Sequence, residues 1–308
     1  MKSIEKAEAG KNKEQRMSEK MKAEEIDKAF MLFSQSCVEH PEFALAYYKR
    51  GKCYMMMHDY KRALYDFSAA FFNQDRLENK QPPSSIIKPE PGGSALFYMC
   101  AGQCNYYLGQ YEEALAHYDI ARARDKDDIS KGLICYNKGL ANASLGRYQD
   151  AIDDYNEAIS AMDQNRSQQA HFQLGATLRK IANSNLQDRE GRSPAQLLRD
   201  SITHLQLACQ QCPSEPTYFN NLGLSQFEAE DYESALHSYE HCIKLEQEKV
   251  TAEKDRSREN LSFYHKNLGL AQYHMGRFDQ ALEQYELAIQ YNDANAENYF
   301  NRGNVRQF

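Results

Sequence analysis

A pattern that recurs along the chain constrains its fold more than any other feature. Each copy has a Gly, an Ala twelve residues later, an aromatic residue after four more and a small residue after three more. Intervals of four and three place side chains on one face of an α-helix. Five copies keep every interval, and a sixth stretches the first interval and has Ser and Leu in place of the Ala and the aromatic residue; in order they are Gly51-Ala63-Phe67-Ala70, Gly102-Ala114-Tyr118-Ala121, Gly139-Ala151-Tyr155-Ala158, Gly175-Ser201-Leu205-Ala208, Gly223-Ala235-Tyr239-Cys242 and Gly269-Ala281-Tyr285-Ala288.

Each copy is predicted to be a helical hairpin. Short turns such as Leu108-Gly109-Gln110-Tyr111 and Leu145-Gly146-Arg147-Tyr148 separate the Gly from the Ala, and a Gly there suits a left-handed helix end. We name the helix with the Gly helix A, and the helix with the Ala–aromatic–small face helix B. A small residue lets the paired helix approach, and the aromatic ring fills the space beside it. Because one hairpin cannot bury its apolar face alone, we expect the copies to stack.

Composition excludes several other classes of protein. Only 15 Gly and 8 Pro occur in 308 residues, and 42% of residues are hydrophobic, which argues against a β-sandwich and against disorder. The longest apolar run, Ala95 to Ala101, is far shorter than the roughly 20 residues of a membrane span. A net charge of −7 with dispersed basic residues argues against nucleic acid as the main partner. Eight Cys in a chain without a secretory signal pattern are expected to be reduced.

The repeated residues resemble the tetratricopeptide repeat (TPR) family over about residues 23–308. That resemblance implies an all-α fold, a right-handed superhelical solenoid of antiparallel helix–turn–helix hairpins. The chain departs from the family pattern because it has no Trp and closes units with Pro only at Pro41 and Pro213. The expected organisation is a charged N-terminal tail or helix at 1–22, a half unit at 23–41, units near 44–76, 95–128, 132–164, 168–213, 216–247 and 262–295, and a truncated unit at 296–308.

Three inserts interrupt the repeat, at 76–94, 183–194 and 246–260. The first holds four of the eight Pro and is predicted to be a loop, as is the second. The third lacks Gly and Pro and is predicted to lengthen the flanking helices. Such inserts either touch partners or are tolerated surface segments. Because the last unit is only half present, we expect either a piece of a longer protein or completion by a partner.

No motif predicts catalysis, a metal site or a cofactor. Phosphate-binding loops, nucleophile elbows and zinc-protease motifs are absent from the sequence. Cys209-x-x-Cys212 resembles half of a zinc or redox site but lacks a second Cys pair. Cys100 and Cys104 are expected to pack inside a hairpin. His237 and His241 could bind a metal ion together, but the sequence offers no third ligand. We therefore predict a protein that is not an enzyme.

The resemblance also implies where partners bind. In TPR solenoids helix A lines the concave groove and helix B the convex back. The matching positions of the first three units form the predicted partner-binding groove: Leu45, Tyr48, Lys52, Met55, Met56, Met99, Gln103, Tyr106, Tyr107, Tyr136 and Leu140. Two interpretations stay open, because these residues either pack between hairpins or present a Met- and Tyr-rich groove for an amphipathic helix or an extended segment.

The favoured function is a protein–protein interaction scaffold, a structural or adaptor subunit of a large intracellular assembly. The expected location is the cytoplasm, with the cilium or axoneme as a narrower hypothesis from the style of the repeats. A co-chaperone or peptide adaptor is one alternative. The carboxylate clamp of co-chaperones would fall on Tyr48, Lys52, Cys100, Leu133 and Asn137, where Lys52 is the single cation, so this alternative is disfavoured. The other alternative is the targeting module of a longer enzyme.

Overall fold

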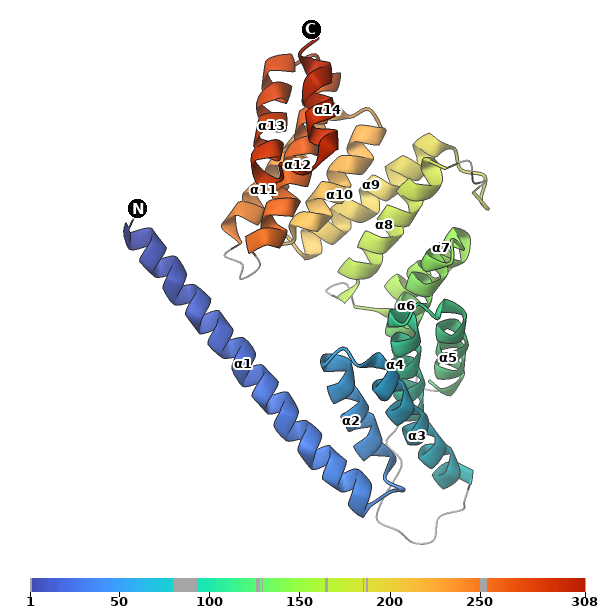
Figure 1. The fold of residues 1–308 in the computed structure, drawn as a ribbon. Coiled ribbons are helices and arrows are strands. Elements are labelled where there is room, and N and C mark those ends of the chain that lie inside the picture. The colour runs from blue at the N-terminus through green and yellow to red at the C-terminus, as the bar shows by residue number, and fades with distance from the viewer. Residues whose placement is uncertain are drawn as a thin grey trace. The chain divides into compact units, whose positions relative to one another are not determined.

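The computed structural model describes residues 2–79, 93–125, 128, 130–163, 166–184, 186, 188–249 and 254–307, with side chains from residue 20 onward outside 77–79, 93 and 254–256. These residues form fourteen α-helices and no strand (Figure 1). The expected all-α class is therefore confirmed for the described part of the chain. Most of the insert at 76–94 and the middle of the insert at 246–260 lie outside it.

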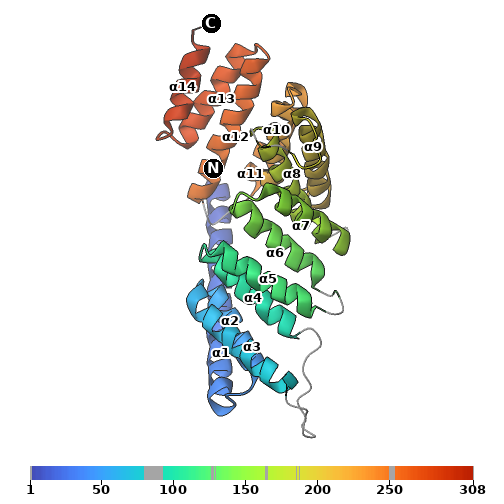
Figure 2. The same ribbon diagram turned by 90° about the vertical axis from the view of Figure 1, so that its right-hand side faces the viewer.

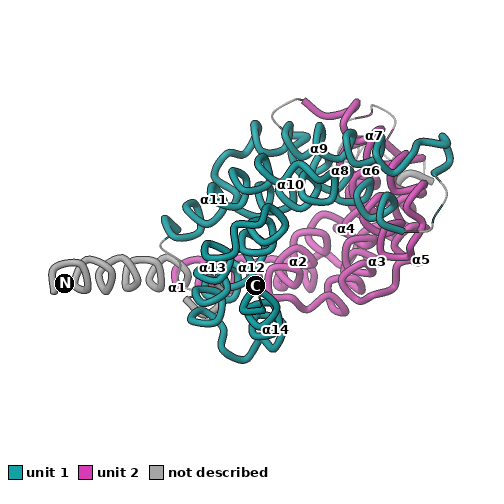
Figure 3. The backbone as a smooth tube through the Cα atoms, turned by 90° about the horizontal axis from the view of Figure 1, so that it is seen from above, with its two compact units in different colours: residues 1–15, 164–308 teal, residues 16–163 magenta. Residues whose placement is uncertain are grey.

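The chain divides into two compact units (Figure 3). The N-terminal unit, Arg16–Asp163, holds most of the first helix and the next six. The first helix is continuous, so no break separates the predicted segments 1–22 and 23–41. The helices of this unit are α1 (Lys2–Glu39), α2 (Ala44–Met56), α3 (Tyr60–Asn79), α4 (Gly93–Tyr107), α5 (Tyr111–Arg124), α6 (Lys131–Ser144) and α7 (Tyr148–Ala161).

The C-terminal unit comprises Gln164–Phe308 together with Met1–Gln15. It continues the alternation of A and B helices, and its last helix is an A helix. Its helices are α8 (Gln168–Ala182), α9 (Pro194–Gln211), α10 (Pro216–Glu228), α11 (Tyr232–Glu248), α12 (Lys254–His274), α13 (Phe278–Tyr291) and α14 (Ala296–Val305).

Consecutive helices pair as the repeat predicts. In the N-terminal unit α2 pairs with α3, α4 with α5 and α6 with α7, and the contacts of α3 with α4 and of α5 with α6 join the hairpins. Figure 2 shows these helices following one another in chain order. In the C-terminal unit α8 pairs with α9, α10 with α11 and α12 with α13, and α14 packs on α13. Each unit is thus a stack of antiparallel hairpins.

The repeated residues form the contact between the helices of a hairpin. A Cβ built on Gly102 would lie 2.5 Å from Cε1 of Tyr118, and one built on Gly139 would lie 2.5 Å from Cε1 of Tyr155. Both rings are buried. The Gly is therefore needed because an aromatic ring of helix B lies directly against the backbone of helix A. The same face is buried in α3, α9, α11 and α13.

The turns between A and B helices adopt the predicted left-handed conformation. The φ angles of Gly109, Gly146 and Gly276 are +76°, +76° and +73°. At the same place in two other hairpins the chain has His58 and Glu230, with φ of +59° and +63°. Those two residues carry a side chain in a region that favours Gly, so these turns are locally strained.

The helix α1 is joined to the hairpin that follows it. The ring of Phe30 meets that of Tyr54 in α2 edge-on, with centroids 5.1 Å apart. The side-chain amide of Asn73 donates a hydrogen bond of 3.0 Å to the carbonyl of Pro41, just beyond the end of α1. The helix α1 thus contacts the next hairpin through Phe30, while Ala29, Phe33 and Ser36 of the predicted half unit stay partly exposed.

Candidate functional site

The predicted partner-binding residues lie on α2, α4 and α6, the three A helices of the N-terminal unit. The helices adjoin, because α4 contacts α6 and the rings of Tyr48 in α2 and Phe97 in α4 are 4.8 Å apart. We use the name A face for the predicted groove residues that are accessible or half-buried, together with the exposed Leu133 of α6: Leu45, Lys52, Met55, Met56, Gln103, Tyr106, Tyr107, Leu133, Tyr136 and Leu140.

Each of the three helices exposes one large apolar side chain on the A face. The exposed fractions are 60% for Met56 in α2, 59% for Tyr107 in α4 and 43% for Leu133 in α6. Apolar side chains that together form a contiguous exposed patch are typical of interaction surfaces. The A face therefore offers apolar contact area from consecutive hairpins.

Two of the predicted groove residues are not accessible. Tyr48 is 9% exposed and Met99 is 5% exposed. The Tyr48 ring is covered because it packs between Phe67 of its own hairpin, 5.9 Å away, and Phe97 of the next. Met99 belongs to the same buried cluster. The prediction that these two side chains line a binding surface is corrected: they join adjacent hairpins.

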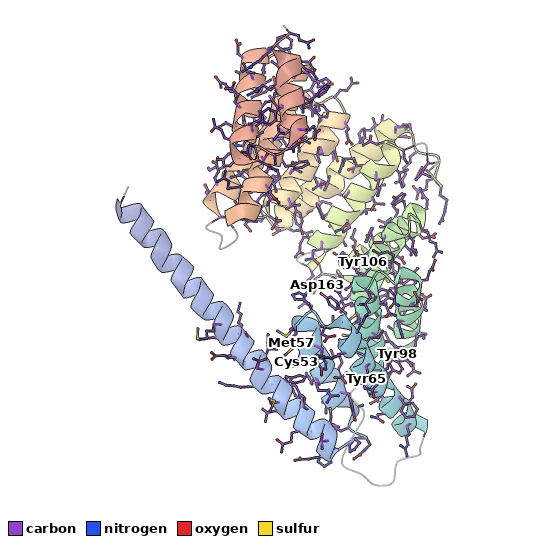
Figure 4. All side chains as sticks on the ribbon, in the orientation of Figure 1. Cys53, Met57, Tyr65, Tyr98, Tyr106 and Asp163 are labelled. Atoms are coloured by element: carbon purple, nitrogen blue, oxygen red, sulfur yellow. The ribbon has the colours of Figure 1, made fainter. Side chains whose placement is uncertain are left out.

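An aromatic cluster lies at the turn end of the A face. Tyr107 stacks on Tyr60 with ring centroids 4.7 Å apart, and Tyr106 lies 5.7 Å from Tyr107 and 5.4 Å from Tyr111. Figure 4 labels Tyr106 near the end of α4 and Met57 near the end of α2. Tyr60 was not among the predicted residues. A signal existed, since an aromatic residue opens helix B in five hairpins, including Tyr60, Tyr111 and Tyr148.

The electrostatics of the A face do not favour an acidic tail. Lys52 is exposed, and its Nζ lies 5.9 Å from the Tyr48 ring centroid. Cys100 is buried, and burial raises the pKa of its thiol, which Lys52 only partly offsets. Asn137 is buried and donates its side-chain amide to the carbonyl of Leu133 at 2.8 Å. The clamp positions therefore hold one free cation rather than a convergent set of donors.

Burial disfavours the reactive thiolate form of two cysteines in the described part of the chain. Burial raises the pKa of Cys104 and of Cys209 to about 12, so both stay thiols near neutral pH. His237 is exposed, with its Nδ1 3.9 Å from a carboxylate oxygen of Glu240. Among the residues that the structure describes, no group of three or more His, Cys, Asp or Glu side chains could hold a metal ion.

No helix in the described portion combines the length and the apolar character that crossing a bilayer requires. The longest helix, α1, is highly charged over the residues with described side chains, where Lys20, Lys22, Glu24 and Glu25 follow in close succession.

Comparison with known proteins agrees with the repeat analysis. The description "Tetratricopeptide repeat" matches residues 101–170, 216–249 and 262–295. The chain belongs to the tetratricopeptide repeat family. Its curated relatives include the photosystem I assembly protein Ycf3 of Acaryochloris marina, 34% identical over 65 residues, and Ycf3 of Synechococcus elongatus, 39% identical over 51 residues. These matches span 21% and 17% of this chain, and 39% and 30% of those relatives.

Solved structures with the same fold come from several proteins. MamA of Desulfovibrio magneticus has a TM-score of 0.52 at 19% identity, covering 66% of this chain and 97% of that one. The Cut9–Hcn1 hetero-tetramer of the APC/C has a TM-score of 0.59 at 13% identity, covering 91% of this chain and 46% of that one. At these identities the likeness establishes the fold alone, an all-α TPR solenoid.

Proposed function

We propose that this protein is a non-enzymatic interaction scaffold, an adaptor or structural subunit that holds a partner protein on its A face. The observation that carries the proposal is the series Met56, Tyr107 and Leu133, three exposed apolar side chains on three consecutive A helices. Ycf3 supports the general class, because its name describes a protein of photosystem I assembly. The partner expected there is an amphipathic helix or an extended segment with apolar side chains.

The physical basis is burial of apolar area on a surface that is already ordered. Covering an exposed Tyr or Met side chain removes apolar area from water at about 25 cal/mol per Å². Tyr adds a large contact area at a small cost in side-chain entropy, and Met adapts to irregular shapes. The stacking of Tyr107 on Tyr60 holds the ring in place before a partner arrives, which reduces the entropy lost on binding.

The test is quantitative affinity capture with the wild type and with Met55→Ala/Tyr106→Ala. Both side chains are half-buried on the A face. We expect a small set of stoichiometric partner subunits with the wild type, and a loss of that set by about tenfold or more with the double variant, since truncating a hot-spot Tyr costs about 2 kcal/mol or more. Circular dichroism must show that helix content is kept.

The matched control is Met31→Ala/Tyr65→Ala. It removes the same two residue types from exposed positions on α1 and the B helix α3. The control should capture the same partners as the wild type. Equal capture by all three proteins would contradict the A-face assignment, and recovery of chaperones alone would favour the co-chaperone alternative.

The finer expectations remain predictions. Membership of one large assembly, a cytoplasmic location and a ciliary or axonemal one each need their own test, for which imaging of the tagged chain in its source cells is the direct measurement. The alternative of a targeting module depends on whether a catalytic domain accompanies this chain. A clamp for acidic tails stays disfavoured because Cys100 and Leu133 occupy two of its positions.

A further inference from the structure

The hydroxyl of Tyr155 is a buried polar group that the packing of its hairpin does not explain. Tyr155 lies on α7 and is fully buried, with its ring against the backbone of Gly139 in α6. In the first hairpin the same position is Phe67, which is also fully buried and lies against Gly51. An aromatic ring without a hydroxyl therefore fills this place equally well, so packing does not explain why residue 155 carries a hydroxyl group.

The Tyr155 hydroxyl has no hydrogen-bond partner among the described residues, although its oxygen is shielded from solvent. An unpaired buried hydroxyl lowers the stability of the folded state. Burial raises the pKa of Tyr155, and the phenols of Tyr136 and Tyr106 raise it further. The group is therefore a neutral O–H near neutral pH, a donor that lacks an acceptor.

The surroundings of this hydroxyl belong to the A face. The rings of Tyr136 and Tyr155 have centroids 6.2 Å apart. Tyr136 and Tyr106 are half-buried A-face residues on adjacent helices, α6 and α4. The buried Tyr155 ring therefore lies next to the half-buried Tyr136 of this surface. A rotation of either half-buried side chain is the motion that would admit an acceptor.

The local charge restricts the kind of acceptor. The carboxyl of Asp154 is the next residue and also disfavours negative charge at the Tyr155 oxygen. Burial raises the pKa of Asp154 to about 6, which the hydrogen bond from Asn142 and the charge of Lys138 offset only in part, and Glu157 and Asp119 raise it further. A second carboxylate inserted here would be desolvated close to like charge, which is costly. A neutral carboxamide oxygen accepts the same hydrogen bond without that cost.

We propose that the Tyr155 hydroxyl is a polar anchor that selects a partner helix carrying one Gln or Asn within its apolar side. The apolar side of that helix covers Met56, Tyr107 and Leu133, and the carboxamide oxygen accepts from Tyr155. This inference rests on the proposed function, because it names the chemistry of the partner that the A face holds.

The test uses two synthetic amphipathic helical peptides that differ in one residue at the centre of the apolar side, Gln in one and Leu in the other. Fluorescence anisotropy measures their affinities for the wild type, Tyr155→Phe and Tyr106→Ala. The wild type should prefer the Gln peptide by about fivefold, the usual worth of one net hydrogen bond. Tyr155→Phe should abolish or reverse this preference while unfolding at an equal or higher temperature, because the lost hydroxyl was unpaired.

Tyr239→Phe is the matched control, since Tyr239 occupies the same repeat position in α11 of the C-terminal unit. It should keep the wild-type preference. The role of Tyr155 as a polar anchor is refuted if the wild type binds both peptides equally or if Tyr155→Phe keeps the preference for Gln. Neither result contradicts the binding of a partner on the A face. Binding that Tyr106→Ala does not weaken, or no binding of either peptide, refutes the A-face function and the anchor with it.

Discussion

Replacement of a helix-A Gly by Ala tests how closely the paired helices approach. In Gly102→Ala the new Cβ would lie 2.5, 2.7 and 3.0 Å from Cε1, Cδ1 and Cζ of Tyr118. Carbon atoms in ordinary contact are about 3.5–4.0 Å apart, so the nearest pair overlaps by about 1 Å. The Tyr118 ring is 1% exposed, and close-packed interiors leave a ring little space to move into.

Two opposing terms decide the outcome. Ala is a better helix former than Gly by about 1 kcal/mol in a helix interior. Overpacking a close-packed core costs about 1–3 kcal/mol. Because the overlap involves three ring atoms rather than the end of a flexible chain, we expect the second term to win. Gly102→Ala should therefore lower the free energy of unfolding by up to about 2 kcal/mol, the difference between the two terms.

Urea unfolding followed by circular dichroism measures the change in the free energy of unfolding. Two further variants test whether the change becomes smaller as the new Cβ has more space. At Gly269 the nearest atom would be 3.1 Å away, so Gly269→Ala should destabilise less. At Gly303 no atom lies within 4 Å, so Gly303→Ala should be neutral or stabilising. A Gly102→Ala variant as stable as the wild type, or a reversed order of the three, would refute the close approach.

Two other predictions concern strain and pH. Glu230→Gly should raise the free energy of unfolding by about 0.5–1 kcal/mol. The left-handed conformation costs a residue with a side chain about 1–2 kcal/mol, and the greater conformational entropy that Gly gives the unfolded chain offsets part of this gain. Thermal unfolding measures the change in stability. Burial lowers the pKa of His204 to about 4, and burial also lowers that of His171, whose Nδ1 is 3.0 Å from Nδ1 of His204. Because the unfolded chain takes up protons that the folded chain excludes, stability should be full above about pH 6.5 and fall towards pH 4. His204→Gln should flatten this slope in urea titrations, and the exposed His237→Gln should leave it unchanged.

Much of the fold was predictable because the repeat spacing indicates both the helices and their pairing into hairpins. The A-to-B pairing follows from the distance between each Gly and the Ala of the next helix, and the left-handed turns follow from Gly109, Gly146 and Gly276. The same turns at His58 and Glu230 show that the geometry of the hairpin dictates the conformation even where the residue is unfavourable.

The candidate site was only partly predictable. The register of helix A placed Met56, Tyr106 and Tyr107 on one face, which local periodicity is enough to show. Periodicity does not reveal which of these positions a neighbouring hairpin covers. Tyr48 and Met99 share the predicted face, yet both are buried against the next hairpin.

The sequence by itself determined that this chain is a set of stacked helical hairpins, because helix periodicity, Gly turns and the alternation of small and aromatic residues are all local properties. Only the tertiary structure decided which side chains remain available to a partner. Phe97 covers Tyr48 from 49 residues away, and the Tyr155 hydroxyl is left unpaired among Tyr106 and Tyr136. Burial and hydrogen-bond satisfaction depend on contacts between hairpins, and no local pattern encodes those contacts.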